Sequence, residues 1–166
     1  MPKKSSPRLA ARKSVYIGLA VVLAAVVAGA AFFALKSALT SKTDSARMAQ
    51  VETGRRIYAE ACAACHGASL EGQANWRKRL PNGRMPAPPH DASGHTWHHS
   101  DEVLFRITKD GPAAYPAGYQ TDMLAFGGRL TEEEIAATLA FIKSTWSPEI
   151  KAKQERIDLD SQRRKP

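Results

Sequence analysis

A stretch of twenty-one uncharged residues, mostly Ala, Val and Leu, runs from Val15 to Leu35. At about 1.5 Å of rise per residue, a helix of that length spans about 30 Å, the thickness of the hydrocarbon core of a bilayer. A secretory signal peptide is the alternative, with Ala28-Gly29-Ala30 as its cleavage site. Because the apolar core of a signal peptide runs for only about 7–15 residues, the length favours an uncleaved transmembrane anchor.

Positive charge is distributed unevenly around this segment. Residues 1–14 carry five Lys or Arg and no acidic residue, whereas only Lys36 and Lys42 follow closely after it. The positive-inside rule therefore places residues 1–14 in the cytoplasm as a basic N-terminus and predicts export of the remaining chain. Residues 36–47, rich in Ser, Thr and Lys, are expected to form a polar linker to an exported domain.

Three segments beyond the linker have helical periodicity: residues 48–61, 100–109 and 131–146. The last has the clearest start, because Thr131 followed by Glu134 makes a capping box. The positions expected to face the core are Val51, Gly54, Tyr58, Val103, Leu104, Ile107, Ile135, Leu139, Ile142 and Trp146. The pattern predicts an all-α domain of three to four helices over residues 48–147.

The ends of these helices carry further signals. Ser100 is expected to cap the second helix, and Ser147-Pro148 to end the third and begin a short fourth helix, to about Leu159, within a charged tail at 148–166. Residues 68–99 and 112–122 have no periodicity and are rich in Gly and Pro, so they are predicted to be loops.

The net charge of +8 and the pI near 9.7 would suit a nucleic-acid-binding protein if the charge lay on the domain. Residues 1–47 carry +7 of this charge, and residues 48–166 carry only +1. The basic character therefore belongs to the N-terminus, and a nucleic-acid partner is disfavoured.

The candidate chemistry lies at Cys62-Ala63-Ala64-Cys65-His66. A C-x-x-C-H sequence is typical of c-type haem attachment, in which two thiols about one helical turn apart form thioethers with the two vinyl groups of one porphyrin. The adjacent His66 then lies under the iron as its proximal ligand. This site uses both cysteines of the chain, so no disulfide framework is expected.

Two other interpretations of the cysteine pair fit the sequence less well. A thioredoxin-like dithiol normally follows a β-strand, whereas residues 51–61 have a helical pattern. A zinc site would complete its ligand set from the histidines of the following loop. Their spacing matches no standard zinc finger, and zinc gives no reason for a histidine directly after the second cysteine. These histidines are His90, His95, His98 and His99.

With this motif and helix pattern, residues 48–147 resemble a class I c-type cytochrome. The resemblance implies an all-α fold around one covalently bound haem c, held by Cys62 and Cys65 and preceded here by the transmembrane helix. It also implies that Gly54 lets the first helix cross closely over the last, near Phe141. The carbonyl of Pro88, in the family's position for such a proline, is expected to accept a hydrogen bond from the proximal histidine.

Met123 is the expected distal iron ligand, because the family places its methionine in a loop before the C-terminal helix, often ahead of a short apolar run that ends in Phe. Met85, which precedes Pro86, is the alternative methionine. Trp97 is expected to donate its indole N–H to a haem propionate or to pack in the core. The histidine cluster at positions 90, 95, 98 and 99 leaves bis-histidine ligation or a copper site open.

The resemblance implies an electron-transfer protein rather than an enzyme, and no catalytic base, nucleophile or substrate-binding motif is evident in the sequence. Its haem domain is expected in the periplasm of a bacterium, tethered to the inner membrane. Its partners would be redox proteins, such as a quinol-oxidising complex and a terminal oxidase. The alternatives are a cytochrome subunit fixed in an oxidase or dehydrogenase complex, with residues 77–84 and 148–166 as contact surfaces, and a copper or ligand sensor that uses the histidine cluster.

Overall fold

The computed structural model of the chain describes residues 7–164, with side chains described at residue 23 and from residue 26 onward. The chain divides into two compact units, Met1–Ala46 and Arg47–Pro166. One long helix, α1 (Pro7–Ala61), contributes residues to both units. The second unit begins one residue before the start that we predicted for the globular domain.

Residues 36–47 differ from the sequence prediction, because they are helical and form part of α1 rather than a polar linker. No Gly or Pro interrupts this stretch, and those are the residues with the lowest helix propensity. The hydroxyls of Thr40 and Thr43 also donate to the carbonyls of Lys36 and Leu39, each at 3.0 Å. These local hydrogen bonds satisfy the polar side chains within the helix.

The predicted apolar segment at 15–35 is helical in its backbone, but the side chains of residues 15–22, 24 and 25 lie outside the described part of the chain. Among the residues described, no helix is both long enough and apolar enough to span a membrane.

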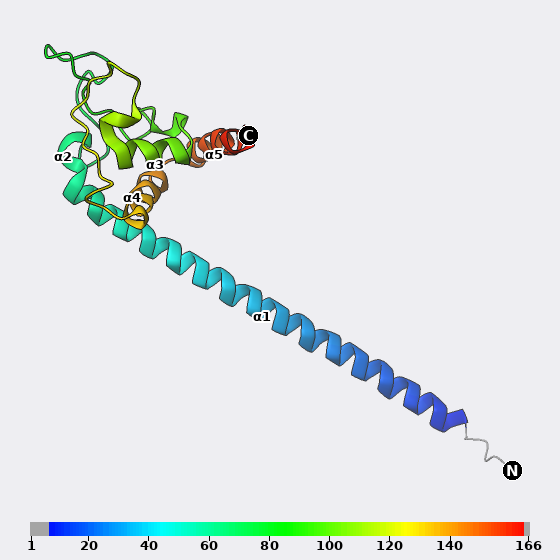
Figure 1. Cartoon of the computed structure of the whole chain (residues 1–166). Helices are drawn as coiled ribbons and strands as arrows, with labels where there is room; N and C mark the ends of the chain where they lie inside the picture. The colour runs from blue at the N-terminus through cyan, green and yellow to red at the C-terminus, as the bar shows by residue number, and fades with distance from the viewer. Residues whose placement is uncertain (1–6, 165–166) are drawn as a thin grey trace. The chain divides into compact units, whose positions relative to one another are not determined.

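The second unit contains the last turns of α1, four further α-helices and two short 3-10 helices (Figure 1). In order these are α2 (Ala63–His66), η1 (Thr96–His98), α3 (Asp101–Asp110), η2 (Gly111–Ala114), α4 (Glu132–Ser144) and α5 (Pro148–Arg163). Within residues 7–164 there is no strand, only one isolated bridge between Met85 and Thr121. The all-α prediction is confirmed.

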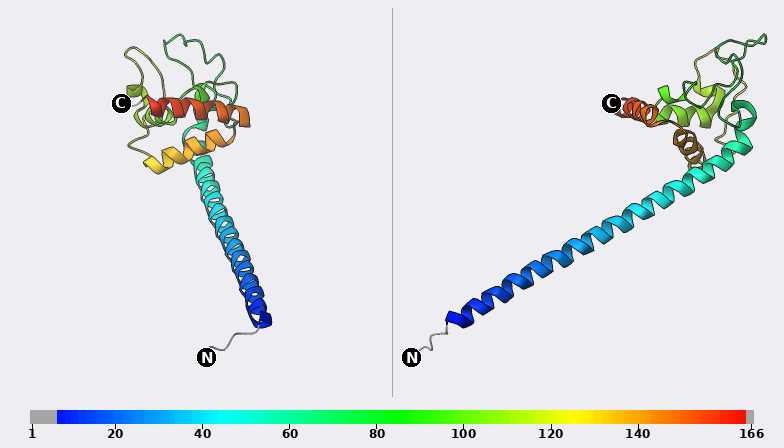
Figure 2. Two further views of the ribbon diagram at one scale, coloured as in Figure 1. Left: turned by 90° about the vertical axis from the view of Figure 1, so that its right-hand side faces the viewer. Right: turned by 180° about the vertical axis from the view of Figure 1, so that it is seen from behind.

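The last turns of α1 cross α4, as Figure 2 shows. The closest approach is at Gly54. A Cβ atom built on Gly54 would lie 1.9 Å from the backbone oxygen of Ala137, so only glycine permits this approach. Phe141, one turn further along α4, packs against Tyr58 with ring centroids 5.4 Å apart. The close helix crossing predicted for Gly54 is present.

The core lies where α1, α4 and the first loop meet. Tyr58, Leu70, Ile142 and Trp146 are buried together, and Cys62 packs against them from the edge. The phenol of Tyr58 donates to the carbonyl oxygen of Gly67 at 2.9 Å, which ties α1 to the residues that follow α2. The core therefore supports the segment that carries the cysteines.

The predicted N-terminal cap is present in α4 but not in α3. The capping box of Thr131 and Glu134 is present at the start of α4. Ser100 lies at the N-cap of α3, but its side chain makes no capping hydrogen bond. The carboxylate of Asp158, from α5, accepts the hydrogen bond of the Asp101 backbone N–H at 2.9 Å instead.

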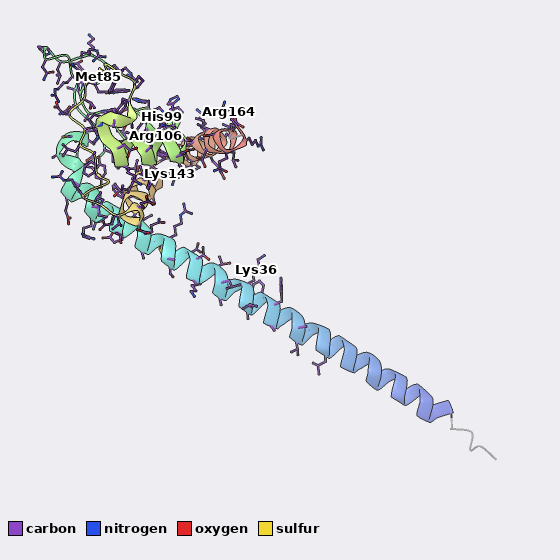
Figure 3. The ribbon with its side chains drawn as sticks, in the orientation of Figure 1. Lys36, Met85, His99, Arg106, Lys143 and Arg164 are labelled. Carbon is purple, nitrogen blue, oxygen red and sulfur yellow. The ribbon has the colours of Figure 1, made fainter. Side chains whose placement is uncertain are left out.

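Helix α5 is longer than predicted, since it continues to Arg163, and it packs against η1. Gln154 on α5 is only 2% exposed and donates to the carbonyl of His99 at 3.3 Å and to a carboxylate oxygen of Asp101 at 2.7 Å. Lys143 of α4 pairs with the same Asp101 carboxylate; Figure 3 labels Lys143 and His99. The predicted tail is thus partly integrated into the domain.

Candidate functional site

The Cys62–His66 segment is a helical turn that follows α1 directly. The backbone N–H of Cys62 donates to the Tyr58 carbonyl at 2.9 Å, and that of His66 donates to the Cys62 carbonyl at 2.9 Å. Residues three and four apart on a helix share one face, so both thiols and the imidazole leave the turn on the same side. Cys62 is half-buried and Cys65 is exposed, and both thiols are free.

The ring of His66 is buried and oriented by the backbone of a distant loop. Its Nδ1 lies 2.8 Å from the carbonyl oxygen of Pro88, which accepts only, so Nδ1 carries the proton. The other ring nitrogen, Nε2, then has a free lone pair. Burial lowers the pKa of His66 and outweighs the opposing effect of the Pro88 hydrogen bond, so the neutral ring is favoured. A neutral imidazole with a fixed tautomer is the form that binds a metal.

Gly72 explains how Pro88 reaches this position. Its φ is +68°, and a Cβ atom there would lie 2.4 Å from the backbone nitrogen of Pro89. The neighbouring Gln73 closes the contact, because its backbone N–H donates to the Ala87 carbonyl at 2.9 Å. Our reading of the sequence missed Gly72, since a loop glycine gives no signal of which distant segment it contacts.

His90 packs directly on His66, the predicted proximal ligand. Its ring stacks on that of His66, with centroids 4.1 Å apart, and its Nδ1 lies 2.8 Å from the hydroxyl of Thr96. Burial lowers the pKa of His90 to about 3, so this ring is neutral at physiological pH. The indole N–H of Trp146 donates to the His90 carbonyl at 2.8 Å. His90 is therefore part of the packed wall of the site.

Trp97 carries an unpartnered polar atom. Its ring stacks on His98, with centroids 3.6 Å apart, and the ammonium of Lys153 lies 5.6 Å from the ring. Within the described part of the chain, its indole Nε1 is the one buried side-chain nitrogen or oxygen with no hydrogen-bond partner. Since a buried indole N–H normally has an acceptor, this atom fits a carboxylate supplied by a bound group such as a haem propionate.

The two candidate methionines lie on loops that pair with each other. The backbone N–H of Met85, labelled in Figure 3, donates to the carbonyl of Gln120 at 2.9 Å, and Met85 forms an isolated parallel bridge with Thr121. Met123 follows two residues later, with its backbone N–H 3.2 Å from the Thr121 hydroxyl oxygen. The hydroxyl of Tyr115 lies 3.8 Å from the sulfur of Met123. Both thioethers are half-buried, and the fold brings their backbones together.

The rings of His95 and His99 contact each other, with centroids 5.4 Å apart, but the other histidines of residues 68–99 lie against different partners. His95 stacks on Trp76, His98 stacks on Trp97, and His90 stacks on His66. Across the residues with described side chains, no group of three or more His, Cys, Asp or Glu is arranged to hold a metal ion. The zinc and copper readings of this cluster therefore have no geometric support within that part of the chain.

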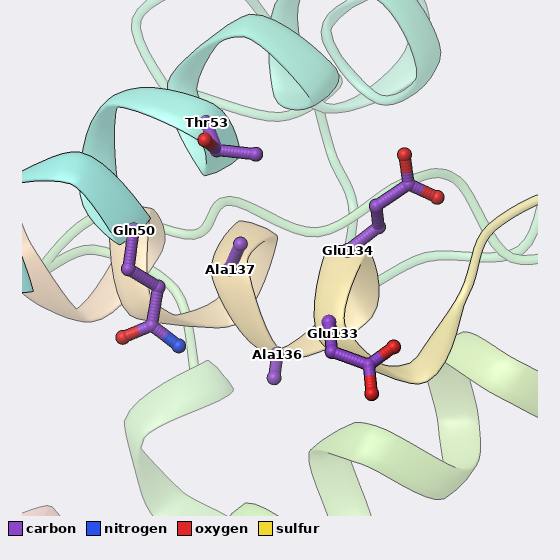
Figure 4. A pocket seen from close by; sticks show the side chains of 6 residues that line it. All are labelled: Gln50, Thr53, Glu133, Glu134, Ala136 and Ala137. Atoms are coloured by element: carbon purple, nitrogen blue, oxygen red, sulfur yellow. The ribbon is translucent and has the colours of Figure 1, made fainter. Parts of the chain in front are cut away.

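A shallow groove lies at the crossing of α1 and α4 (Figure 4). One of its two carboxylates, that of Glu134, is used in the capping box of α4. The lining residues are Gln50, Thr53, Glu133, Glu134, Ala136 and Ala137. None of them is a candidate from the sequence, and the groove is separate from the cysteine motif.

Comparison with known proteins gives one positive result. The family model for cytochrome c matches residues 51–146, a range that contains the cysteine motif, Pro88, Trp97 and Met123. No curated protein and no solved structure gives a significant match.

Proposed function

We infer the function from one premise: the chain belongs to the cytochrome c family, whose model covers more than half of its length. This family binds haem c covalently, and Cys62 and Cys65 fit its C-x-x-C-H motif. When bound, the haem iron alternates between the ferrous and ferric states and so carries one electron at a time. The protein is therefore a haem-based electron-transfer protein that exchanges electrons with redox partner proteins.

We propose the following roles for the residues around the haem. His66 would hold the iron through Nε2, while the Pro88 carbonyl holds its Nδ1–H and so fixes the ring plane. Met123 would supply the second ligand, a thioether, which would favour the ferrous state relative to a second histidine. The Trp97 indole N–H would donate to a propionate, which would satisfy the one buried donor in the described residues that lacks a partner.

The observation that carries this assignment is the His66–Pro88 contact. The two residues are 22 positions apart, and their 2.8 Å contact fixes the tautomer that leaves Nε2 free beside the two free thiols. A dithiol redox protein has no need of such an arrangement. If His66 and Met123 both held the iron, no site would remain for a substrate, so we propose electron transfer without catalysis.

Visible spectroscopy of the holoprotein tests the ligand assignment. The reduced protein should show the sharp α band of haem c, and the oxidised protein the weak far-red band of a methionine–iron(III) bond. Met123→Ala should abolish the far-red band, whereas the matched variant Met85→Ala should retain it. Loss of the band in Met85→Ala alone would transfer the distal role to Met85.

We also propose that the chain is anchored in a bacterial inner membrane, with its haem domain in the periplasm. The support is the uncharged segment Val15–Leu35, the basic residues before it, and the helical backbone of α1 through this region. Such a tethered carrier would link a quinol-oxidising complex to a terminal oxidase. Membrane fractionation tests the anchor: the full chain should stay with membranes at high salt, and a chain that begins at residue 37, exported with a cleavable leader, should not.

A further inference from the structure

The geometry points to Arg84 as a positioning residue. It holds the methionine loop, which runs from residue 112 to Met123, against the long loop at residues 68–99. This inference rests on the proposed function, because it concerns the retention of the Met123 thioether on the iron. Arg84 belongs to the basic segment 77–84, a predicted contact surface for a protein complex, and here it has a structural role within the chain itself.

Arg84 makes two contacts with the segment that leads into Met123. One guanidinium nitrogen donates to the carbonyl of Thr121 at 3.2 Å and also forms a short ion pair with the carboxylate of Asp122. The adjacent Met85 amide adds the backbone bridge to residue 120. Arg84 and Met85 thus hold residues 120–122, which immediately precede Met123.

Arg84 is itself fixed by the turn that precedes it. Its backbone N–H donates to the side-chain oxygen of Asn82 at 3.0 Å, and its carbonyl accepts from the Leu80 N–H at 2.9 Å. The guanidinium of Arg79 closes the turn by donating to the Gly83 carbonyl at 2.7 Å. The turn is therefore ordered by its own hydrogen bonds, so the Arg84 guanidinium starts from a fixed backbone.

A second set of contacts runs in parallel from the same turn. The guanidinium of Arg79 lies 6.0 Å from the ring of Tyr119, and Tyr119 stacks on Tyr115 with centroids 4.4 Å apart. Tyr115 in turn approaches the Met123 sulfur. The turn therefore also contacts the methionine loop at Tyr119, just before the residues that Arg84 holds, and the stacked tyrosines extend this set of contacts to Met123.

The consequence concerns the exchange of the distal ligand. In the oxidised holoprotein an external ligand at sufficient concentration would displace the Met123 thioether from the iron, and each contact that holds the loop would oppose this exchange. The Arg84 and Asp122 side chains are 46% and 65% exposed, so solvent screens the attraction between their charges. Its loss should lower the concentration of competitor needed for displacement by about two- to fivefold at low salt.

The test is an imidazole titration of the oxidised holoprotein, in which the loss of the far-red band is monitored. Arg84→Ala and Asp122→Ala should each lower the midpoint concentration, and the double variant should show no more than the larger single effect, because both remove one interaction. The difference should shrink at high salt. Lys78→Ala is the matched control, since it removes one positive charge from the same loop without touching residues 120–122.

Amide hydrogen exchange at Met85 is a second measurement that does not depend on the iron. Its N–H is held by the Gln120 carbonyl, so exchange should be faster in Arg84→Ala and unchanged in Lys78→Ala. Wild-type midpoints and exchange rates in Arg84→Ala, or additive effects in the double variant, would overturn the inference while leaving the proposed function intact. Retention of the far-red band in Met123→Ala would instead overturn the ligand assignment, and the inference with it.

Discussion

Replacing Gly54 with alanine tests the helix crossing on which the domain is built. The added methyl would lie 1.9 Å from the Ala137 oxygen, 2.4 Å from the Ala137 carbonyl carbon and 2.9 Å from the Thr138 nitrogen. All three atoms belong to the backbone of α4, so no side-chain rotation can relieve the contact. To bring the shortest distance to 3.0 Å, the two helices must separate by about 1 Å at this point.

The magnitude follows from two opposing effects. Alanine favours a helix over glycine by about 1 kcal/mol, which alone would stabilise the variant. Overpacking of a rigid core contact costs about 1–3 kcal/mol or more, and separation also weakens the packing of Tyr58 against Phe141. We therefore expect Gly54→Ala to lower the free energy of unfolding by about 1–2 kcal/mol, which corresponds to a fall of several degrees in the thermal midpoint.

Thermal unfolding of the holoprotein, monitored by far-ultraviolet circular dichroism, measures this change. Gly128→Ala is the matched control, because a Cβ atom there would have nothing within 4 Å and the backbone φ is not positive. The control should keep the wild-type midpoint or exceed it slightly. If Gly54→Ala were as stable as Gly128→Ala, the close crossing of α1 over α4 would be wrong.

Three further substitutions test other parts of the account. Thr131→Ala should cost about 1 kcal/mol of unfolding free energy in the same assay, because it removes the N-cap acceptor of α4. Gln154→Ala should cost about 1–3 kcal/mol, because it removes two hydrogen bonds donated by a buried side chain, one of them to the Asp101 carboxylate, whereas the exposed Glu155→Ala should have no measurable effect. Trp97→Phe should lower the reduction potential by roughly tens of millivolts, because loss of the indole donor leaves more negative charge near the iron, and Trp76→Phe should leave the potential unchanged.

The sequence predicted those features of the domain that depend on local signals. The capping box located the start of α4, Pro148 located the start of α5, and the periodicity of α1 predicted its end before the cysteines. The cost of a glycine in a helix interior marked Gly54 as a residue that needs a reason, but its role in the helix crossing came from the family resemblance. The Pro88 contact came from the family resemblance, since nothing local to a proline-rich loop specifies which side chain its carbonyl reaches.

The features that the sequence did not predict depend on contacts between distant residues. Asp158 replaces Ser100 as the acceptor at the start of α3 only because α5 packs there, 57 positions further along the chain. Arg84 pairs with Asp122, which is 38 positions further along the chain, and both lie in loops whose sequences have no periodicity. In residues 36–47 a polar composition suggested a linker, but polar residues without Gly or Pro are equally compatible with a continuous exposed helix.

The central claim, that one covalent haem carries single electrons, is tested most directly by a potentiometric titration of the purified full chain, followed at the α band of the reduced form. We predict one transition, with about 59 mV for each tenfold change in the ratio of oxidised to reduced protein, as a one-electron couple requires. Absence of an α band, or a slope of about 30 mV from a two-electron couple of the Cys62 and Cys65 thiols, would contradict it.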